Sequence, residues 1–317
     1  MKKALVFLAA PAMVLWATVA SATPNKSFTA AKSVLPSTIQ VVGSSNVKAI
    51  RSTSLFQKLF PQIIQSQREV SDGLDKVKKT CGIDAVSSID DVTVGVEAKD
   101  EGLILVALSG VTEQKLSDCI VKIAKNETGE VVTVKKTGNV TEFSSSKGSK
   151  KLYAAWLPGD VLAFASDPTD KKLLDRMLAG KGTLDKGSLG PFLGRVAFDS
   201  ALSLAWSKSM PIESWTMKGG VLDVALNGST FNGTATLKLA STKEATDLAA
   251  TAQKELSKAQ SGAPQQAQTV LKTVTISAKG DDVTAKASAS DKDLIGLAGL
   301  FLGRPSTAAT PPAGPHR

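Results

Sequence analysis

The strongest constraint on the fold is a pattern that occurs four times along the chain. Each copy has two short runs of alternating apolar and polar residues around a turn, followed at once by a capped helical segment. Alternation predicts strands with one buried and one solvated face, and such strands favour antiparallel pairing. The sequence therefore predicts an α+β fold built from β-hairpin-plus-helix units, with helices packed on one face of each sheet.

The four units are spread evenly over the chain. The strand pairs are expected at about residues 92–107, 152–165, 222–239 and 274–287, and the helix N-caps at Thr112, Asp167, Ser241 or Thr242, and Ser290. A stretch rich in Gly, Ser and Lys, residues 180–190, separates the first two units from the last two. This arrangement predicts an internal duplication, with halves at 36–182 and 183–304 that form either one continuous sheet or two domains.

The N-terminus has the features of a cleavable signal peptide over residues 1–22. Two lysines precede an apolar run of about 17 residues, which ends in the small-x-small sequence Ala20-Ser21-Ala22. A retained membrane anchor is the alternative, although the run is short for a span and contains Pro11. Since no cysteine follows the run, the sequence predicts a periplasmic or secreted protein that is not integral to the membrane after cleavage.

Both margins of the mature chain are expected to lack regular structure. Residues 23–35 are largely polar and predict a flexible N-terminal segment. Residues 305–317 contain four prolines among small residues and predict a disordered tail.

The chain contains two cysteines, Cys81 and Cys119. Each lies on the apolar side of a helical pattern, so both are expected to face the same core. An even pair in an oxidising compartment predicts a disulfide bond, with two buried free thiols as the alternative. The pair lacks the Cys-x-x-Cys spacing of a redox or metal site.

Charge and residue types exclude several classes of function. The formal net charge is +9, but the lysines are dispersed and aromatic residues are only 5% of the chain, which argues against a nucleic-acid partner. The only histidine, His316, lies in the Pro-rich tail, so catalysis by Ser-His-Asp or Cys-His groups and zinc binding by histidines are excluded. There is no phosphate or dinucleotide motif. The sequence therefore predicts no metal, no cofactor and no catalytic residues.

Two pairs of adjacent carboxylates remain as candidates for a glycosidase. They are Asp90-Asp91 and Asp281-Asp282, and both flank predicted strands at turns. Aspartate is favoured in turns because it hydrogen-bonds nearby backbone, so the structural role is the preferred interpretation. A hydrolase is accordingly the third hypothesis for function.

The leading hypothesis is a non-catalytic binding protein whose partner is another envelope protein or an apolar molecule, held on a sheet face or in a groove between the halves. Trp215, in a loop-like stretch, is the aromatic residue expected to contact a partner. The alternative hypothesis is a carrier of a lipid or another hydrophobic ligand. Phe56 and Phe60, on an apolar helix bent by Pro61, are expected to line its groove.

Several stretches resemble a group of uncharacterised exported proteins of Gram-negative bacteria. They are Leu35–Gly43, Ser54–Leu59, Cys81–Asp84 with Asp91–Gly95, Leu152–Trp156 and Met217–Gly220. The resemblance implies export and a repeat architecture. It implies no activity that could be assigned to this chain.

Overall fold

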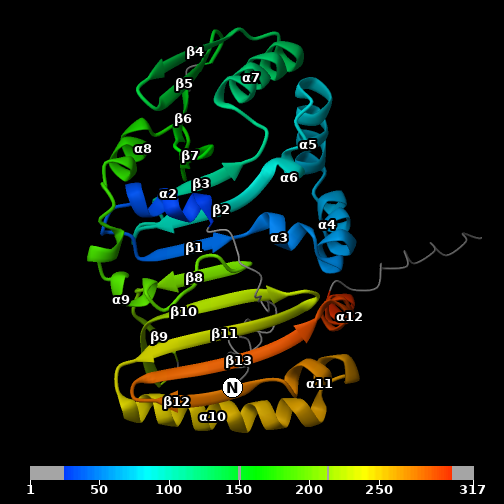
Figure 1. Cartoon of the computed structure of the whole chain (residues 1–317), viewed down its shortest axis with the longest axis vertical. Coiled ribbons are helices and arrows are strands. Elements are labelled where there is room, and N and C mark those ends of the chain that lie inside the picture. The colour runs from blue at the N-terminus through cyan, green and yellow to red at the C-terminus, as the bar shows by residue number, and fades with distance from the viewer. Residues whose placement is uncertain (1–24, 149–150, 213, 302–317) are drawn as a thin grey trace, which may run out of the picture.

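The computed structural model describes residues 25–148, 151–212 and 214–301, and in this part of the chain every strand belongs to one antiparallel sheet of 13 strands (Figure 1). The strands are β1 (Val41–Ser45), β2 (Ile89–Val96), β3 (Gly102–Leu108), β4 (Val132–Thr137), β5 (Val140–Ser145), β6 (Lys151–Leu157), β7 (Val161–Ala165), β8 (Leu202–Trp206), β9 (Met210–Ile212), β10 (Trp215–Asn227), β11 (Thr230–Leu239), β12 (Thr275–Lys279) and β13 (Asp282–Ser290). Their spatial order is β12-β13-β11-β10-β8-β1-β2-β3-β7-β6-β5-β4, and β9 pairs with β10. The α+β class is confirmed.

The helices connect these strands and cover parts of the sheet. They are α2 (Lys26–Val34), α3 (Val47–Arg51), α4 (Ser54–Ser66), α5 (Arg68–Cys81), α6 (Ala85–Ser88), α7 (Glu113–Thr128), α8 (Lys171–Leu178), the 3-10 helix η2 (Leu184–Lys186), α9 (Gly190–Leu193), α10 (Thr242–Gly262), α11 (Gln265–Leu271) and α12 (Asp291–Phe301). The predicted signal peptide, residues 1–22, and the predicted tail, residues 305–317, lie outside the described residues.

Three of the four predicted helix starts are confirmed. Thr112 and Ser241 are N-caps whose side chains accept a hydrogen bond from the backbone of the first turn, and the Ser290 hydroxyl accepts one from the Asp293 amide at 3.2 Å. The fourth prediction was wrong, because Asp170 rather than Asp167 caps α8. The Asp167 carboxylate instead accepts hydrogen bonds from Thr169 in the preceding turn.

The prediction that residues 23–35 form a loose segment was wrong for the residues described. Residues 26–34 form α2, which packs against β2, β3 and β7. The polarity of this segment indicates a loose stretch of chain. Its polar residues Asn25 and Ser27 are instead buried and hydrogen-bonded to Ser44 and Thr93 on the sheet. Phe28, with Ala31 and Leu35, contributes to the largest apolar cluster.

The predicted halves share one sheet. β8 belongs to the second predicted half, yet it pairs along its whole length with β1 of the first half and with β10 of its own. The boundary at residue 183 therefore does not separate two sheets. The duplication remains a hypothesis.

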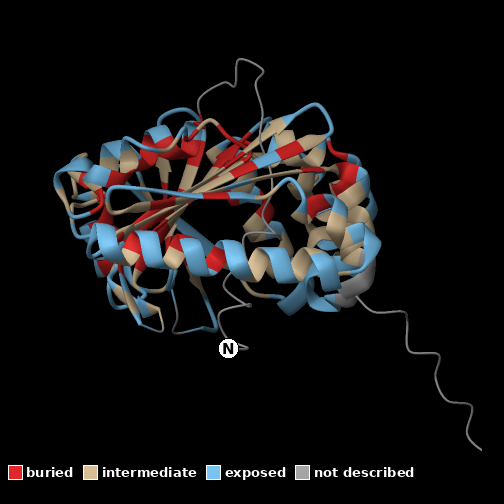
Figure 2. Ribbon diagram, turned by 90° about the horizontal axis from the view of Figure 1, so that it is seen from below, coloured by how far each residue is buried: buried red, intermediate tan, exposed pale blue. Residues whose placement is uncertain are grey.

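Helices cover both faces of the sheet, which corrects the prediction of a single covered face. Ser44, Thr93 and Ser203 share one face by their pairing, and α2 packs there; we call this the α2 face. Leu204 points to the opposite face and pairs in register through Leu222 and Ala235 with Ala285. There α10 packs on β12 and β13 (Figure 2), and we call it the α10 face.

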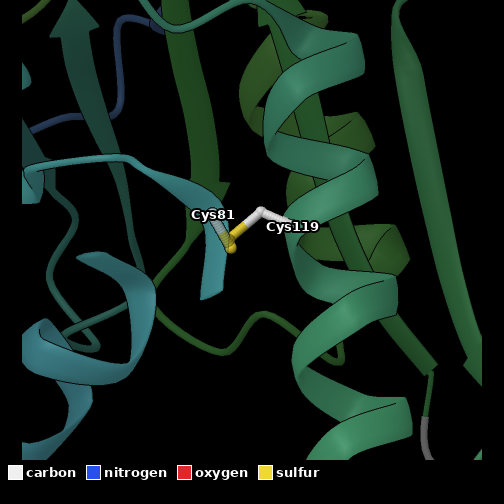
Figure 3. The surroundings of a disulfide bond; sticks show 2 residues. All are labelled: Cys81 and Cys119. Atoms are coloured by element: carbon white, nitrogen blue, oxygen red, sulfur yellow. A yellow bond between two sulfur atoms is a disulfide. The ribbon is translucent and has the colours of Figure 1, made fainter. Parts of the chain in front are cut away.

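The predicted disulfide between Cys81 and Cys119 is confirmed. It joins the last residue of α5 to the middle of α7 (Figure 3), with 5.3 Å between the two Cα atoms. Cys119 is buried among Leu108, Val111 and Ile83. The bond therefore attaches α5, which has no fully buried residue of its own, to a core cluster.

Candidate functional site

The central strands carry an apolar strip on the α10 face. The members of the strip are all half-buried, and none belongs to the four apolar core clusters of the described residues or to the side chains packed against them. They are Val41, Val92, Val94, Val96, Ile104, Phe164, Leu202, Leu204, Trp206 and Leu222. A continuous, half-buried apolar surface that belongs to no core cluster is a candidate binding surface.

Strand register aligns the strip into rows across the sheet. In the central row each residue is the direct pairing partner of the next, from β7 to β10. The row reads Phe164, Ile104, Val94, Gly43, Leu204 and Leu222. Direct partners in an antiparallel pair project from the same face, so this row forms one uninterrupted apolar surface.

On the opposite face of the sheet, the side chains of β11 and β13 are polar rather than apolar. On the α2 face of β11 and β13 the side chains are polar, including Thr234, Thr236 and Thr284. The Thr236 and Thr284 hydroxyls lie 3.2 Å apart, within hydrogen-bond distance. This part of the α2 face therefore carries side chains that can hydrogen-bond to each other, whereas the side chains of the strip are apolar.

Gly43 makes a notch in the centre of the strip. A Cβ added there would meet the Leu204 side chain at 3.5 Å and backbone at 3.9 Å, which are ordinary contact distances. Two other glycines on this face are required by close neighbours: a Cβ on Gly102 would lie 2.5 Å from a backbone oxygen, and one on Gly220 would lie 2.5 Å from the Trp206 ring. Packing does not explain Gly43. A glycine in a strand interior often marks the close approach of another group.

Trp206 lies at one end of the strip and carries an unpaired polar atom. Its ring lies against Gly220, and its Nε1 is buried without a hydrogen-bond partner. A buried donor without a partner costs about 1–3 kcal/mol, so an acceptor that reached the indole would be stabilised there. The core clusters of the described residues do not include Trp206.

A series of contacting helices borders the other end of the strip. Helices α7, α5, α4, α12, α11 and α10 contact one another in this order and follow one side of the sheet in Figure 1. The strip meets them where β1 ends at Ser45 and leads through α3 into α4. Trp206 lies at the opposite end of β8, away from these helices.

The predicted groove residues lie on α4. The rings of Phe56 and Phe60 are half-buried and stack with centroids 4.4 Å apart. Leu55 and Leu59, one position before each, pack with Phe231 under the sheet. The two phenylalanines thus lie on a different stripe of α4 from the packed leucines, and their role in a groove stays a prediction.

The predicted partner contact, Trp215, is not in a loop. It is the first residue of β10, it pairs with Ile212 of β9, and it packs against the cluster beneath α10. Its half-buried position leaves a role in partner contact as a prediction.

Both carboxylate pairs make structural contacts. Asp91 is buried and accepts hydrogen bonds from the backbone at the start of α2, while Asp90 lies 3.6 Å from the Lys26 ammonium. Asp281 and Asp282 pair with Lys238 and Arg195 respectively. These contacts favour the structural interpretation of the pairs over a glycosidase site.

Two other kinds of feature have no candidate among the described residues. No group of three or more His, Cys, Asp or Glu residues within those ranges is arranged to hold a metal ion. None of the helices found there combines the length and apolar character that crossing a membrane requires.

Asp223 is the acid whose protonation responds most directly to burial. It lies on the α2 face and accepts hydrogen bonds from the Ser200 and Ser203 hydroxyls at 3.1 and 3.0 Å. Burial raises the pKa of Asp223 above its ordinary value, with a further rise from the charge of Asp199, and the two serine hydrogen bonds oppose the rise. The folded protein therefore binds this proton more tightly than the unfolded chain does.

This linkage predicts a pH-dependent effect of Asp223→Asn. The wild-type free energy of unfolding falls as the pH rises from the ordinary aspartate pKa through the raised folded value, because ionised Asp223 is destabilised by burial. We expect Asp223→Asn to raise the melting temperature at pH 7 and to leave it nearly unchanged at about pH 3, below the ordinary pKa of about 3.9. Thermal melting at both pH values, with the exposed Asp72→Asn as control, tests this; an equal gain at both would contradict it.

Comparisons with known proteins show no family for this chain. No family model matches it, and no curated protein matches it. Among solved structures, it is similar to TP0453 in crystal form I, with a TM-score of 0.46 and 14% identity over 84% of this chain and 95% of that one. Crystal form III of TP0453 gives a TM-score of 0.46 and 14% identity over 88% and 98%. At this level the similarity supports no functional conclusion.

Proposed function

We propose that this protein is an exported, non-catalytic binding protein that holds an apolar molecule on the apolar strip. The observation that carries the proposal is the notch at Gly43 in the middle of an apolar row that no described core cluster includes. Burying this surface under a ligand would be favourable by roughly 25 cal/mol for each Å² of apolar area removed from water.

The strip suits a hydrocarbon better than a protein surface. Protein interfaces carry about one hydrogen bond per 100–200 Å². On the strip the strands are interior to the sheet, so their backbone groups are already paired with both neighbours. Ser45 is the only hydroxyl in the rows that cross β1. A hydrocarbon chain makes no hydrogen bonds with water, so it gives up none when it binds to such a surface.

Filling the notch should block the site. We expect Gly43→Leu to weaken binding of the apolar fluorophore N-phenyl-1-naphthylamine by about tenfold or more, because each CH₂ group that remains in water instead of being buried costs about 0.8 kcal/mol. The protein is first stripped of co-purified lipid, and binding is measured by the rise in probe fluorescence. Gly73→Leu on α5 is the matched control, because a Cβ there meets open space.

Three results would overturn the proposal. They are a stripped wild-type protein that does not bind the probe, equal binding by the Gly43→Leu and Gly73→Leu variants, and recovery of a stoichiometric envelope protein on the strip in place of an apolar molecule. If Gly43→Leu does not fold by circular dichroism, Leu222→Gln provides the second test. This variant reduces the apolar surface at the end of the same row without adding volume.

A further inference from the structure

We infer that the ligand is a single-chain amphiphile whose anionic, hydrogen-bond-accepting head lies at Trp206 and whose acyl chain crosses the strip toward Phe164. This inference rests on the proposed function and gives its ligand a chemical class and a direction. It follows from three features of the strip: one unpaired donor, positive charge at the same end, and a matching length.

The unpaired donor is the Trp206 Nε1. It is buried and has no hydrogen-bond partner, while the other side chains of the strip are hydrocarbon. A ligand that presents an oxygen acceptor at this end and hydrocarbon elsewhere would satisfy the indole and leave no polar group of its own on the apolar rows. A pure hydrocarbon would leave the donor unsatisfied.

Positive charge gathers at the same end of the strip. Lys208 follows Trp206 by two residues, and Lys218 precedes Gly220, the pairing partner of Trp206, by two residues. Both lysines are exposed, and neither forms an ion pair with an acid among the described residues. Long lysine side chains can extend their ammonium groups toward an anion bound at a neighbouring strand end.

Glu97, an acid at the same end of the sheet, does not cancel that charge. Glu97 follows Val96 directly, but Arg176 already binds its carboxylate at 2.6 Å, and Thr38 donates a second hydrogen bond to it. The free charge at the Trp206 end is therefore positive, which complements a carboxylate or phosphate head.

The distance from Trp206 across the strip to Phe164 matches an acyl chain. From Trp206 on β8 to Phe164 on β7 there are four strand spacings, or about 19 Å at about 4.8 Å each. The hydrocarbon core of a bilayer, about 30 Å thick, holds two acyl chains end to end, so one chain accounts for about 15 Å or more when extended. The head therefore lies at the open end, and the chain runs over Val41, Val94 and Ile104.

Displacement of N-phenyl-1-naphthylamine by three ligands of similar chain length tests the inference. The ligands are palmitate, hexadecanol and lysophosphatidylglycerol. We expect palmitate or lysophosphatidylglycerol to displace the probe at a concentration at least about tenfold lower than hexadecanol, because a charge-assisted hydrogen bond is roughly twice as strong as a neutral one. The stronger of the two anions identifies a free fatty acid or a phospholipid as the source of the head.

Two variants locate the head. Trp206→Phe keeps a ring but removes the donor, and we expect it to weaken displacement by the preferred anion about tenfold more than it weakens displacement by hexadecanol. Trp156→Phe, which makes the same change outside the strip, is the matched control. The double variant Lys208→Gln/Lys218→Gln should remove the salt dependence of anion binding and leave hexadecanol unaffected.

The outcomes separate the inference from the proposed function. If the probe binds but the three ligands displace it equally, or if Trp206→Phe and Trp156→Phe behave alike, the inference is overturned and the apolar site stands. If the stripped wild-type protein does not bind the probe, the proposed function itself fails. If Trp206→Phe does not fold, the double lysine variant decides. A loss of its preference for anions supports the inference, and an unchanged preference overturns the inference.

Discussion

Replacing both cysteines with alanine should lower the free energy of unfolding by about 3–4 kcal/mol, because the bond closes a loop of this size in the unfolded chain. Cys81 and Cys119 are 38 residues apart in sequence. The loss should be largest for α5, which has no fully buried side chain and depends on the bond for its attachment to α7. Urea denaturation measures the global effect, and faster amide hydrogen exchange in α5 measures the local one.

Reduction of the wild-type protein is the control for this prediction. The reduced protein should match the Cys81→Ala/Cys119→Ala variant in both stability and exchange, because both lack the same cross-link. Ellman's reagent should detect no free thiol in the native protein before reduction. A loss smaller than about 1 kcal/mol, well below the usual range for a native disulfide, or unchanged exchange in α5, would contradict the structural role given to the bond.

The second large effect is expected for Asp91→Ala, which should lower the free energy of unfolding by about 2–3 kcal/mol. The Asp91 carboxylate is buried and accepts hydrogen bonds from the backbone amides of Lys26 and Ser27, at 3.3 and 2.7 Å. These amides are at the N-terminus of α2, where the helix itself provides no acceptor and where its dipole favours a negative charge. Alanine would leave both amides without this partner.

The neighbouring Asp90 provides the matched control. Asp90 is paired with Lys26 at 3.6 Å, and its carboxylate also accepts a hydrogen bond from the Ser109 hydroxyl; 45% of the lysine side chain and 13% of the aspartate side chain are exposed. We expect Asp90→Ala to cost less than Asp91→Ala, about 1–2 kcal/mol, because no amide at the start of a helix depends on the Asp90 carboxylate. Urea denaturation of the two variants under the same conditions decides the matter: an Asp91→Ala variant no less stable than Asp90→Ala would show that α2 is held by its apolar residues alone.

The sequence predicted hairpins and helix N-caps well, because the residues that form them are close together in the chain. The alternation in β2 and β3, β10 and β11, and β12 and β13 required only a turn and a neighbour in sequence, and these hairpins are present. Thr112 and Ser241 were identifiable as N-caps because a cap bonds to its own helix. One hairpin, β4–β5, was missed because β4 is almost wholly exposed and lacks the alternation.

Contacts between distant segments were not predictable in the same way. The predicted loose segment became α2 because Ser27 and Asn25 find their partners on β1 and β2, which local polarity cannot reveal. The pairing of β1 with β8 joins residues about 160 positions apart, and it decides that the two predicted halves form one sheet. Alternation says that a strand has two faces, but only the connections decide which face each helix covers.

The candidate site is also formed by contacts between segments that are distant in the sequence. In the sequence, Gly43 is only a residue that disfavours strands, and Trp206 is only one apolar residue in an alternating pattern. Register across six strands places Gly43 in the centre of an apolar row and Trp206 in the neighbouring row, at the end of the strip away from the helices. The sequence by itself determined four of the hairpins, three of the four helix starts and the pair of cysteines, because neighbouring residues specify hydrogen bonds and periodicity. Only the tertiary structure decided which apolar face stays uncovered, because cover is supplied by helices far away in the chain.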